Sequence, residues 1–185
     1  MVLVGCSMGG TLAMDFALEY PNKVLALVLV GSGPSGLSME VPDHPQAASA
    51  EEAYKQGDLD RVAELEAQIW FDGMGRTASQ VNQLARELAL KMNRLALDHD
   101  ARQLGKRLPD TDTPAAERLV ELTIPVLVIV GDHDIPYLQV AAEYMFEHIA
   151  TARKAIMMDA AHLSNMEHPK QFRNTVRRFL DEIAG

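Results

Sequence analysis

Short runs of uninterrupted apolar residues alternate with longer amphipathic segments at both ends of the chain. Val2–Val4, Val24–Val30 and Val126–Val130 are such runs, and they are typical of strands buried on both faces of a parallel sheet. Helical spacing of apolar residues follows over 11–20 and 137–149. The order strand, turn, helix, strand predicts βαβ units and therefore a parallel sheet with flanking helices.

The end of the chain repeats this alternation of strands and helices, whereas the middle of the chain does not. A short strand is expected at Lys154–Met158 and a final amphipathic helix at His168–Ile183. From 47 to about 107 the chain is rich in Ala, Leu, Glu, Gln and Arg, which favours helices, and Gly73-Met74-Gly75 divides two helical stretches. Leu108–Pro114 is a polar loop that contains proline.

These boundaries predict a core and an insertion. Residues 1–36 and 115–185 carry the strand signals and form an α/β core. Residues 37–114 carry no strand signal, so we expect a helical insertion between the two parts of the core.

Composition and charge narrow the function. The 185 residues are 48% hydrophobic and 23% charged, which is the balance of a soluble globular protein. The net charge of −9 argues against nucleic acid or an anionic membrane as the main partner. A single cysteine, Cys6, excludes an internal disulfide and fits a cytoplasmic location. His44 and His99 show no ligand spacing with Cys or acidic residues, so no metal site is expected.

A candidate nucleophile follows the first strand. Gly5-Cys6-Ser7-Met8-Gly9 matches G-x-S-x-G, in which a strained turn between strand and helix exposes the serine hydroxyl. The turn needs small neighbours, and we expect Gly5, Gly9 and Gly10 to supply them. The N–H of Met8 at the start of the next helix would then face a developing oxyanion. The alternative is that Ser7 is an ordinary turn serine.

An acid and a base follow two later strands. Asp134 comes after Val126–Val130, and His162 lies in the loop after the fourth strand. The carboxyl ends of parallel strands meet at one sheet edge, where a carboxylate can orient a histidine. Three alternatives stay open here: Asp134 could only cap the next helix, Asp132 could be the acid, and His162 could be a plain loop histidine.

At these residues the chain resembles the α/β-hydrolase superfamily. Its elbow strand is similar to Val2–Gly10, its next strand to Pro21–Gly31, and its acid strand to Pro125–Asp134. Ala161-His162, followed by Glu167-His168-Pro169, is similar to the histidine loop of the family, with Ala161 in place of the usual glycine. The resemblance implies a catalytic triad and no cofactor. It assigns that triad to three residues, Ser7, Asp134 (rather than Asp132) and His162.

The insertion between Gly33 and Thr123 resembles the helical cap of this superfamily. Trp70-Phe71-Asp72-Gly73 is similar to a stretch in small bacterial members near the enol-lactonase, esterase and perhydrolase groups. A cap over the sheet edge would form most of a substrate pocket. The expected pocket residues are Trp70, Phe71, Met74 and Met92. The alternative is that these side chains only pack the cap against the core.

The family places strands and a loop with a second oxyanion donor before the elbow, and this chain starts on the elbow strand. We therefore expect a partial fold in which Met8 is the one retained donor. Val2–Val4 would be an exposed edge strand open to pairing with a second copy.

The expected function is hydrolysis of a small ester or lactone through an acyl-enzyme on Ser7, without cofactor or metal. Peroxide could replace water as the acceptor with the same residues. The alternative from another class is a non-catalytic or truncated fragment that acts through protein interaction.

Overall fold

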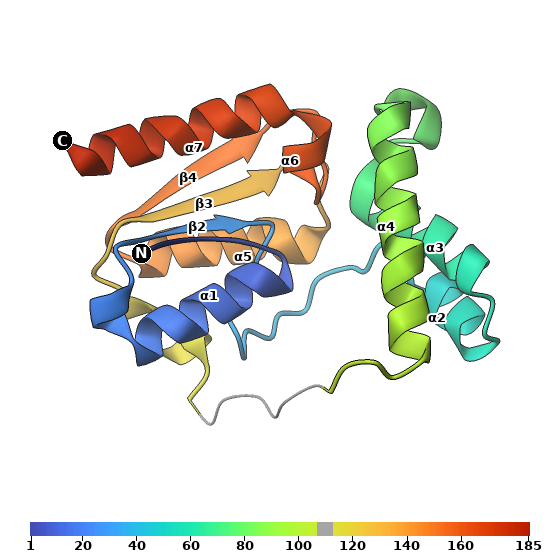
Figure 1. The fold of residues 1–185 in the computed structure, drawn as a ribbon, viewed down its shortest axis with the longest axis horizontal. Coiled ribbons are helices and arrows are strands. Elements are labelled where there is room, and N and C mark those ends of the chain that lie inside the picture. The colour runs from blue at the N-terminus through green and yellow to red at the C-terminus, as the bar shows by residue number, and fades with distance from the viewer. Residues whose placement is uncertain (107–112) are drawn as a thin grey trace.

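A four-stranded parallel sheet forms the centre of the computed structural model, which describes residues 1–106 and 113–185 (Figure 1). The strands are β1 (Val2–Cys6), β2 (Ala26–Val30), β3 (Val126–Gly131) and β4 (Ala152–Met157). They pair in the order β1-β2-β3-β4, and every pair is parallel. The predicted α/β class is confirmed.

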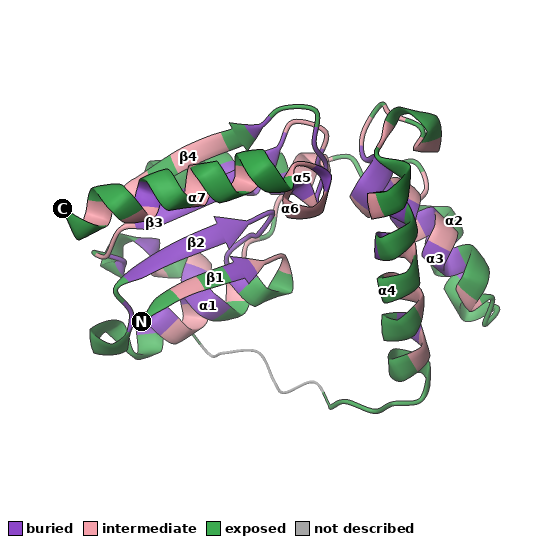
Figure 2. Cartoon of the chain, turned by 45° about the horizontal axis from the view of Figure 1, so that its top comes forward, coloured by how far each residue is buried: buried purple, intermediate pink, exposed green. Residues whose placement is uncertain are grey.

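Helices cover both faces of the sheet (Figure 1). On one face α1 (Met8–Glu19) and α5 (Pro136–His148) pack against β2 and β3 through a core that includes Met14, Leu29 and Met145. On the other face lies α7 (Pro169–Ala184), whose Phe179 belongs to a second core. Every residue of β2 is buried, as an uninterrupted apolar run predicts (Figure 2).

The prediction that Val2–Val4 is buried on both faces is wrong, and the prediction that it forms an exposed edge strand is confirmed. These residues do form β1, but Val2 is 39% exposed and Val4 is 57% exposed, and only Leu3 packs against a core. The reason is topological. Within the described residues β1 pairs with β2 alone, so it lies at the edge of the sheet.

The described part of the segment predicted as a cap contains helices and no strand, and these helices lie to one side of the sheet (Figure 1). It contains α2 (Ala47–Lys55), α3 (Leu59–Ala67), a π-helical turn η2 (Gln68–Asp72) and α4 (Gln83–Ala101). Most of the loop predicted at 108–114 falls outside the described residues. Short 3₁₀ turns occur at Pro21–Lys23, Ala78–Gln80, Ala115–Glu117 and Leu119–Glu121, and a short helix α6 at Ser164–Glu167.

The first helical stretch of the insertion is broken where the sequence analysis expected continuity. Gly57 has a φ of +74°, and the Asp58 side chain accepts a hydrogen bond from the N–H of Arg61, so α3 starts as a separate capped helix. The pair α2 and α3 then packs with α4 around a small apolar core that includes Val62 and Leu97.

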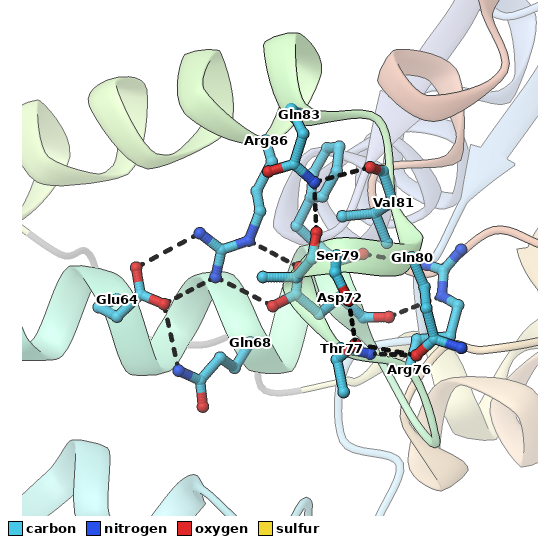
Figure 3. A network of polar contacts seen from close by, with 12 residues as sticks. Glu64, Gln68, Asp72, Arg76, Thr77, Ser79, Gln80, Val81, Gln83 and Arg86 are labelled. Atoms are coloured by element: carbon cyan, nitrogen blue, oxygen red, sulfur yellow. Dashed lines mark hydrogen bonds and ion pairs between the residues drawn. The ribbon is translucent and has the colours of Figure 1, made fainter.

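A buried arginine joins the helices of the insertion (Figure 3). Arg86 of α4 donates from Nε to Asp72 Oδ1 at 2.7 Å and from Nη2 to Asp72 Oδ2 at 2.9 Å. It also bonds Glu64 of α3, at 2.8 Å from Nη2 to Oε1. The hydrogen bonds to Asp72 and Glu64 raise the pKa of Arg86, and the bond from Arg86 lowers the pKa of Glu64. These ion pairs compensate the charge of the buried Asp72 carboxylate.

Candidate active site

Ser7 sits on a strained turn between β1 and α1. Its φ is 53° and its ψ is −126°, a conformation that few non-glycine residues adopt. Its N–H donates to the carbonyl of Val30 at 2.8 Å, which ties the turn to the end of β2. A Cβ on Gly5 would overlap the backbone of Gly9 and Gly10, and one on Gly10 would overlap the Ser32 side chain. Both glycines are therefore required by close packing.

The prediction that the turn needs a small residue at Gly9 is wrong, judged by the residues that the structure describes. Gly9 lies inside α1, and a Cβ there would meet no atom within 4 Å. Its backbone is not in the left-handed region either. Of the three glycines, Gly5 and Gly10 are therefore the ones that close packing requires.

The structure places His162 against Asp134. Asp134 follows β3 and is fully buried, and His162 lies in the loop after β4 with 6% of its surface exposed. His162 Nδ1 lies 3.2 Å from Asp134 Oδ2. Because a carboxylate only accepts, Nδ1 carries the proton and Nε2 is left as the basic nitrogen. Gly31 (φ +50°) packs beneath this pair, and a Cβ there would lie 2.8 Å from His162 Nδ1.

The two alternatives for the acid differ in their partners. Asp132 Oδ1 accepts from the N–H of Ala160 at 3.1 Å, so it holds the backbone of the histidine loop and not the imidazole ring. Asp134 does not cap α5, since the N-cap residue is Ile135 and has no side-chain cap bond. The second carboxylate oxygen of Asp134, Oδ1, accepts a hydrogen bond from the N–H of Ile135 at 2.8 Å.

A cavity of about 360 Å³ lies between the insertion and this sheet edge. Its wall contains Ser7 and His162 from the core, and the Trp70 ring lies 4.8 Å from the His162 ring between centroids. Other residues of the wall are Glu66, Ala67, Phe71, Ala89, Met92, Asn93, Ala96 and Leu163. The structure thus brings Ser7, His162, Trp70, Phe71 and Met92 to one cavity.

Met74 is not part of this wall. Its N–H donates to the carbonyl of His133 at 2.8 Å, and its carbonyl lies 2.7 Å from His133 Nδ1. Met74 therefore joins the insertion to the turn after β3. Glu66 and Asn93 do line the cavity, and the sequence analysis missed them because polar residues on helices usually face solvent.

The loop that carries His162 is fixed by a buried carboxylate. Glu167 accepts the N–H of Ala161 on Oε1 at 2.6 Å, and its Oε2 lies 2.8 Å from Nη2 of Arg76. The side chains of this ion pair are 3% and 5% exposed. Burial raises the pKa of Glu167, and the Ala161 amide and Arg76 oppose that rise.

Arg76 belongs to the insertion, and no pattern in the sequence predicts a role for it. It donates to the carbonyl of Phe71 at 3.0 Å and, across the interface, to the carbonyl of Asp159 at 2.7 Å. The wall of the cavity and the histidine loop therefore share one buried guanidinium.

Met8 is the first residue of α1 and follows Ser7 directly. The first N–H groups of a helix have no partner within that helix, and they carry partial positive charge. The geometry is thus compatible with the expected role of the Met8 N–H toward an oxyanion.

Cys6, next to Ser7, is a rival nucleophile by position only. Burial, reinforced by the charge of Asp134, raises the pKa of its thiol to about 11. The thiolate, which is the reactive form, is then about a hundredfold scarcer at neutral pH than on an ordinary cysteine.

We expect iodoacetamide at pH 7.5 to alkylate the folded chain more than tenfold slower than the urea-unfolded chain, measured by mass. Equal rates would contradict the buried, protonated thiol.

Neither a helix long and apolar enough to cross a membrane nor a cluster of three potential metal ligands occurs in the part of the chain that the structure describes.

Comparison with known proteins decides the family. The sequence model described as "alpha/beta hydrolase fold" matches residues 1–169 of the 185. The chain belongs to the α/β-hydrolase family. The resemblance noted from the sequence is therefore confirmed.

Relatives of this α/β hydrolase include two proteins named 2-hydroxy-6-oxononadienedioate/2-hydroxy-6-oxononatrienedioate hydrolase. The one from Burkholderia vietnamiensis is 30% identical over 184 residues, and the one from Klebsiella pneumoniae is 28% identical over 182. In both cases the match covers 96% of this chain and 61% of the relative. The chain thus spans less than two thirds of the length of these relatives.

Solved structures show the same fold. An esterase from Rhodococcus sp. ECU1013 superposes with a TM-score of 0.72 at 21% identity, covering 98% of this chain and 65% of the esterase. A thermophilic esterase from Thermogutta terrifontis superposes with a TM-score of 0.70 at 24% identity, covering 99% of this chain and 65% of that protein.

Proposed function

We propose that the protein is a serine hydrolase that cleaves a small ester or lactone through an acyl-enzyme on Ser7. The observation that carries this proposal is the contact of 3.2 Å between His162 Nδ1 and Asp134 Oδ2, with His162 and Ser7 in the wall of the same cavity. The names of the relatives and of the structural neighbours, which include hydrolases and esterases, support it.

Acylation in this mechanism starts with the Ser7 hydroxyl. Its oxygen attacks the substrate carbonyl while His162 Nε2 takes its proton. The imidazolium is stabilised by Asp134, and the oxyanion accepts a hydrogen bond from the Met8 N–H. When the C–O bond of the ester breaks, His162 returns the proton to the leaving alkoxide, and the acyl group stays on Ser7.

Deacylation repeats these steps with water. His162 Nε2 takes a proton from water as the water oxygen attacks the acyl-enzyme, and the same proton then goes to Ser7 as the acid leaves. The apolar wall formed by the insertion shields the acyl group from solvent, which strengthens each electrostatic contact at the reacting atoms.

A fluorophosphonate probe tests the proposal, because it labels serines that are activated by a neighbouring base. We expect labelling of the wild-type protein and none of Ser7→Ala. The control is Ser49→Ala, which removes an exposed hydroxyl from α2 and should label fully. Circular dichroism checks that all three proteins are folded. Labelling that survives in Ser7→Ala, or a folded wild-type protein that does not label, would contradict the proposal.

A further inference from the structure

One carboxylate lies in the otherwise mainly apolar wall that the insertion gives to the cavity. Glu66 of α3 and Asn93 of α4 are both half-buried there, and Asn93 Nδ2 donates to Glu66 Oε2 at 2.8 Å. The other oxygen, Oε1, accepts no hydrogen bond within the described residues, so it is available to a ligand. Beside this pair the wall is formed by Trp70, Phe71, Met92 and small or aliphatic residues.

The wall of the cavity carries a negative charge that no cationic side chain of the wall offsets. Among the described residues that line the cavity there is no lysine or arginine, and Glu66 is the one acidic side chain. The amide of Asn93 orients the carboxylate but does not neutralise it. A ligand carboxylate in the cavity would therefore meet a like charge across a medium of lower dielectric than water, whereas an ammonium group would meet an opposite charge.

We propose that this cavity selects substrates whose body is apolar and whose end distant from the reacting carbonyl is cationic or donates hydrogen bonds, and that it disfavours substrates bearing a carboxylate at that end. Glu66 Oε1 receives the distal group, and Trp70 and Met92 contact the apolar body. The inference rests on the proposed function, because a substrate preference requires that bound esters or lactones are turned over at Ser7. The charge preference itself is a property of binding and can be measured without turnover.

Three amides of matched length test this preference: 6-aminohexanamide, hexanamide and the monoamide of adipic acid. Trp70 is the one tryptophan of the chain and lines the cavity, so its fluorescence reports occupancy. We expect the Kd of the cationic amide to be about tenfold lower than that of the anionic amide, as a charge interaction near a protein surface predicts, with the neutral amide between them.

Two variants separate Glu66 from the general charge of the protein. Glu66→Gln should bring the Kd values of the cationic and anionic amides within about twofold of each other, since it keeps the shape and removes the charge. Glu87→Gln makes the same change at an exposed site of α4 outside the cavity, and should leave the tenfold difference in place.

Each outcome decides the inference. Equal or tighter binding of the anionic amide, no binding of any amide, or a preference that survives in Glu66→Gln would overturn it. Loss of the preference only in Glu66→Gln supports it. Labelling of Ser7 by the fluorophosphonate is scored separately, so failure of the charge preference and failure of the hydrolase mechanism are told apart.

Discussion

Asparagine in place of Asp134 is expected to lower kcat toward a small ester about 10⁴-fold while the protein stays folded, which is the loss seen when the acid of a serine protease triad becomes an amide. Asp134 Oδ1 accepts from the N–H of Ile135, so the asparagine oxygen should take that position and turn its NH₂ group toward His162. His162 Nδ1 must then accept, which places the ring proton on Nε2. A protonated Nε2 cannot take the proton of Ser7.

The neighbouring carboxylate provides the control. Asp132 accepts one hydrogen bond from the N–H of Ala160, and an asparagine oxygen can replace it there. Asp132→Asn should therefore change kcat by less than about threefold, because it leaves the tautomer of His162 as it was. Steady-state hydrolysis of p-nitrophenyl acetate measures both variants. If Asp132→Asn lost activity as severely as Asp134→Asn, or if Asp134→Asn kept a tenth of the wild-type kcat, the assignment of Asp134 as the acid would be wrong.

The strands of the core, the turn at Ser7 and the proximity of Asp134 to His162 could be predicted from signals near each residue. An uninterrupted apolar run such as Val126–Val130 predicts a strand, and it is buried here because it lies between β2 and β4. Glycines such as Gly5 mark a turn that other residues cannot make. The order of strands in a parallel sheet then brings the residues after β3 and β4 to one edge. That rule places Asp134 and His162 near one edge, whereas the choice of Asp134 over Asp132 came from the resemblance to the family.

The contacts that the sequence did not reveal join positions far apart in the chain. Arg76 and Glu167 are 91 residues apart, and nothing near either of them signals the other. Glu66 and Asn93 look like solvated helix positions until α3 and α4 are packed together over the cavity. Met74, in contrast, is apolar and is predicted to line the pocket. Its backbone hydrogen-bonds to His133 instead, which holds Met74 at the turn after β3 and outside the wall of the cavity.

Methionine in place of Arg76 is expected to lower the free energy of unfolding by about 3–5 kcal/mol, because it leaves the buried Glu167 carboxylate without its ion-pair partner. The side chain of Glu167 is 3% exposed, so water cannot replace the guanidinium. Urea unfolding measures the loss. The control is Arg94→Met, which breaks a pair with the 88% exposed Asp60 and should leave the urea midpoint almost unchanged, because water solvates both charges there.

The loss in Arg76→Met should depend on pH in a way that identifies Glu167 as its origin. Burial already raises the pKa of Glu167, and removing Arg76 removes one of the groups that oppose the rise. A carboxyl group with a raised pKa in the folded state stabilises the fold below its unfolded pKa, and that contribution is lost as pH rises through the folded value. The variant should therefore lose less stability at pH 5 than at pH 8. Adding Glu167→Gln, which keeps an acceptor for the Ala161 N–H, should recover part of the stability and remove this pH dependence. If Arg76→Met lost the same stability at pH 5 and at pH 8, the unpaired Glu167 carboxylate would not be the cause of the loss.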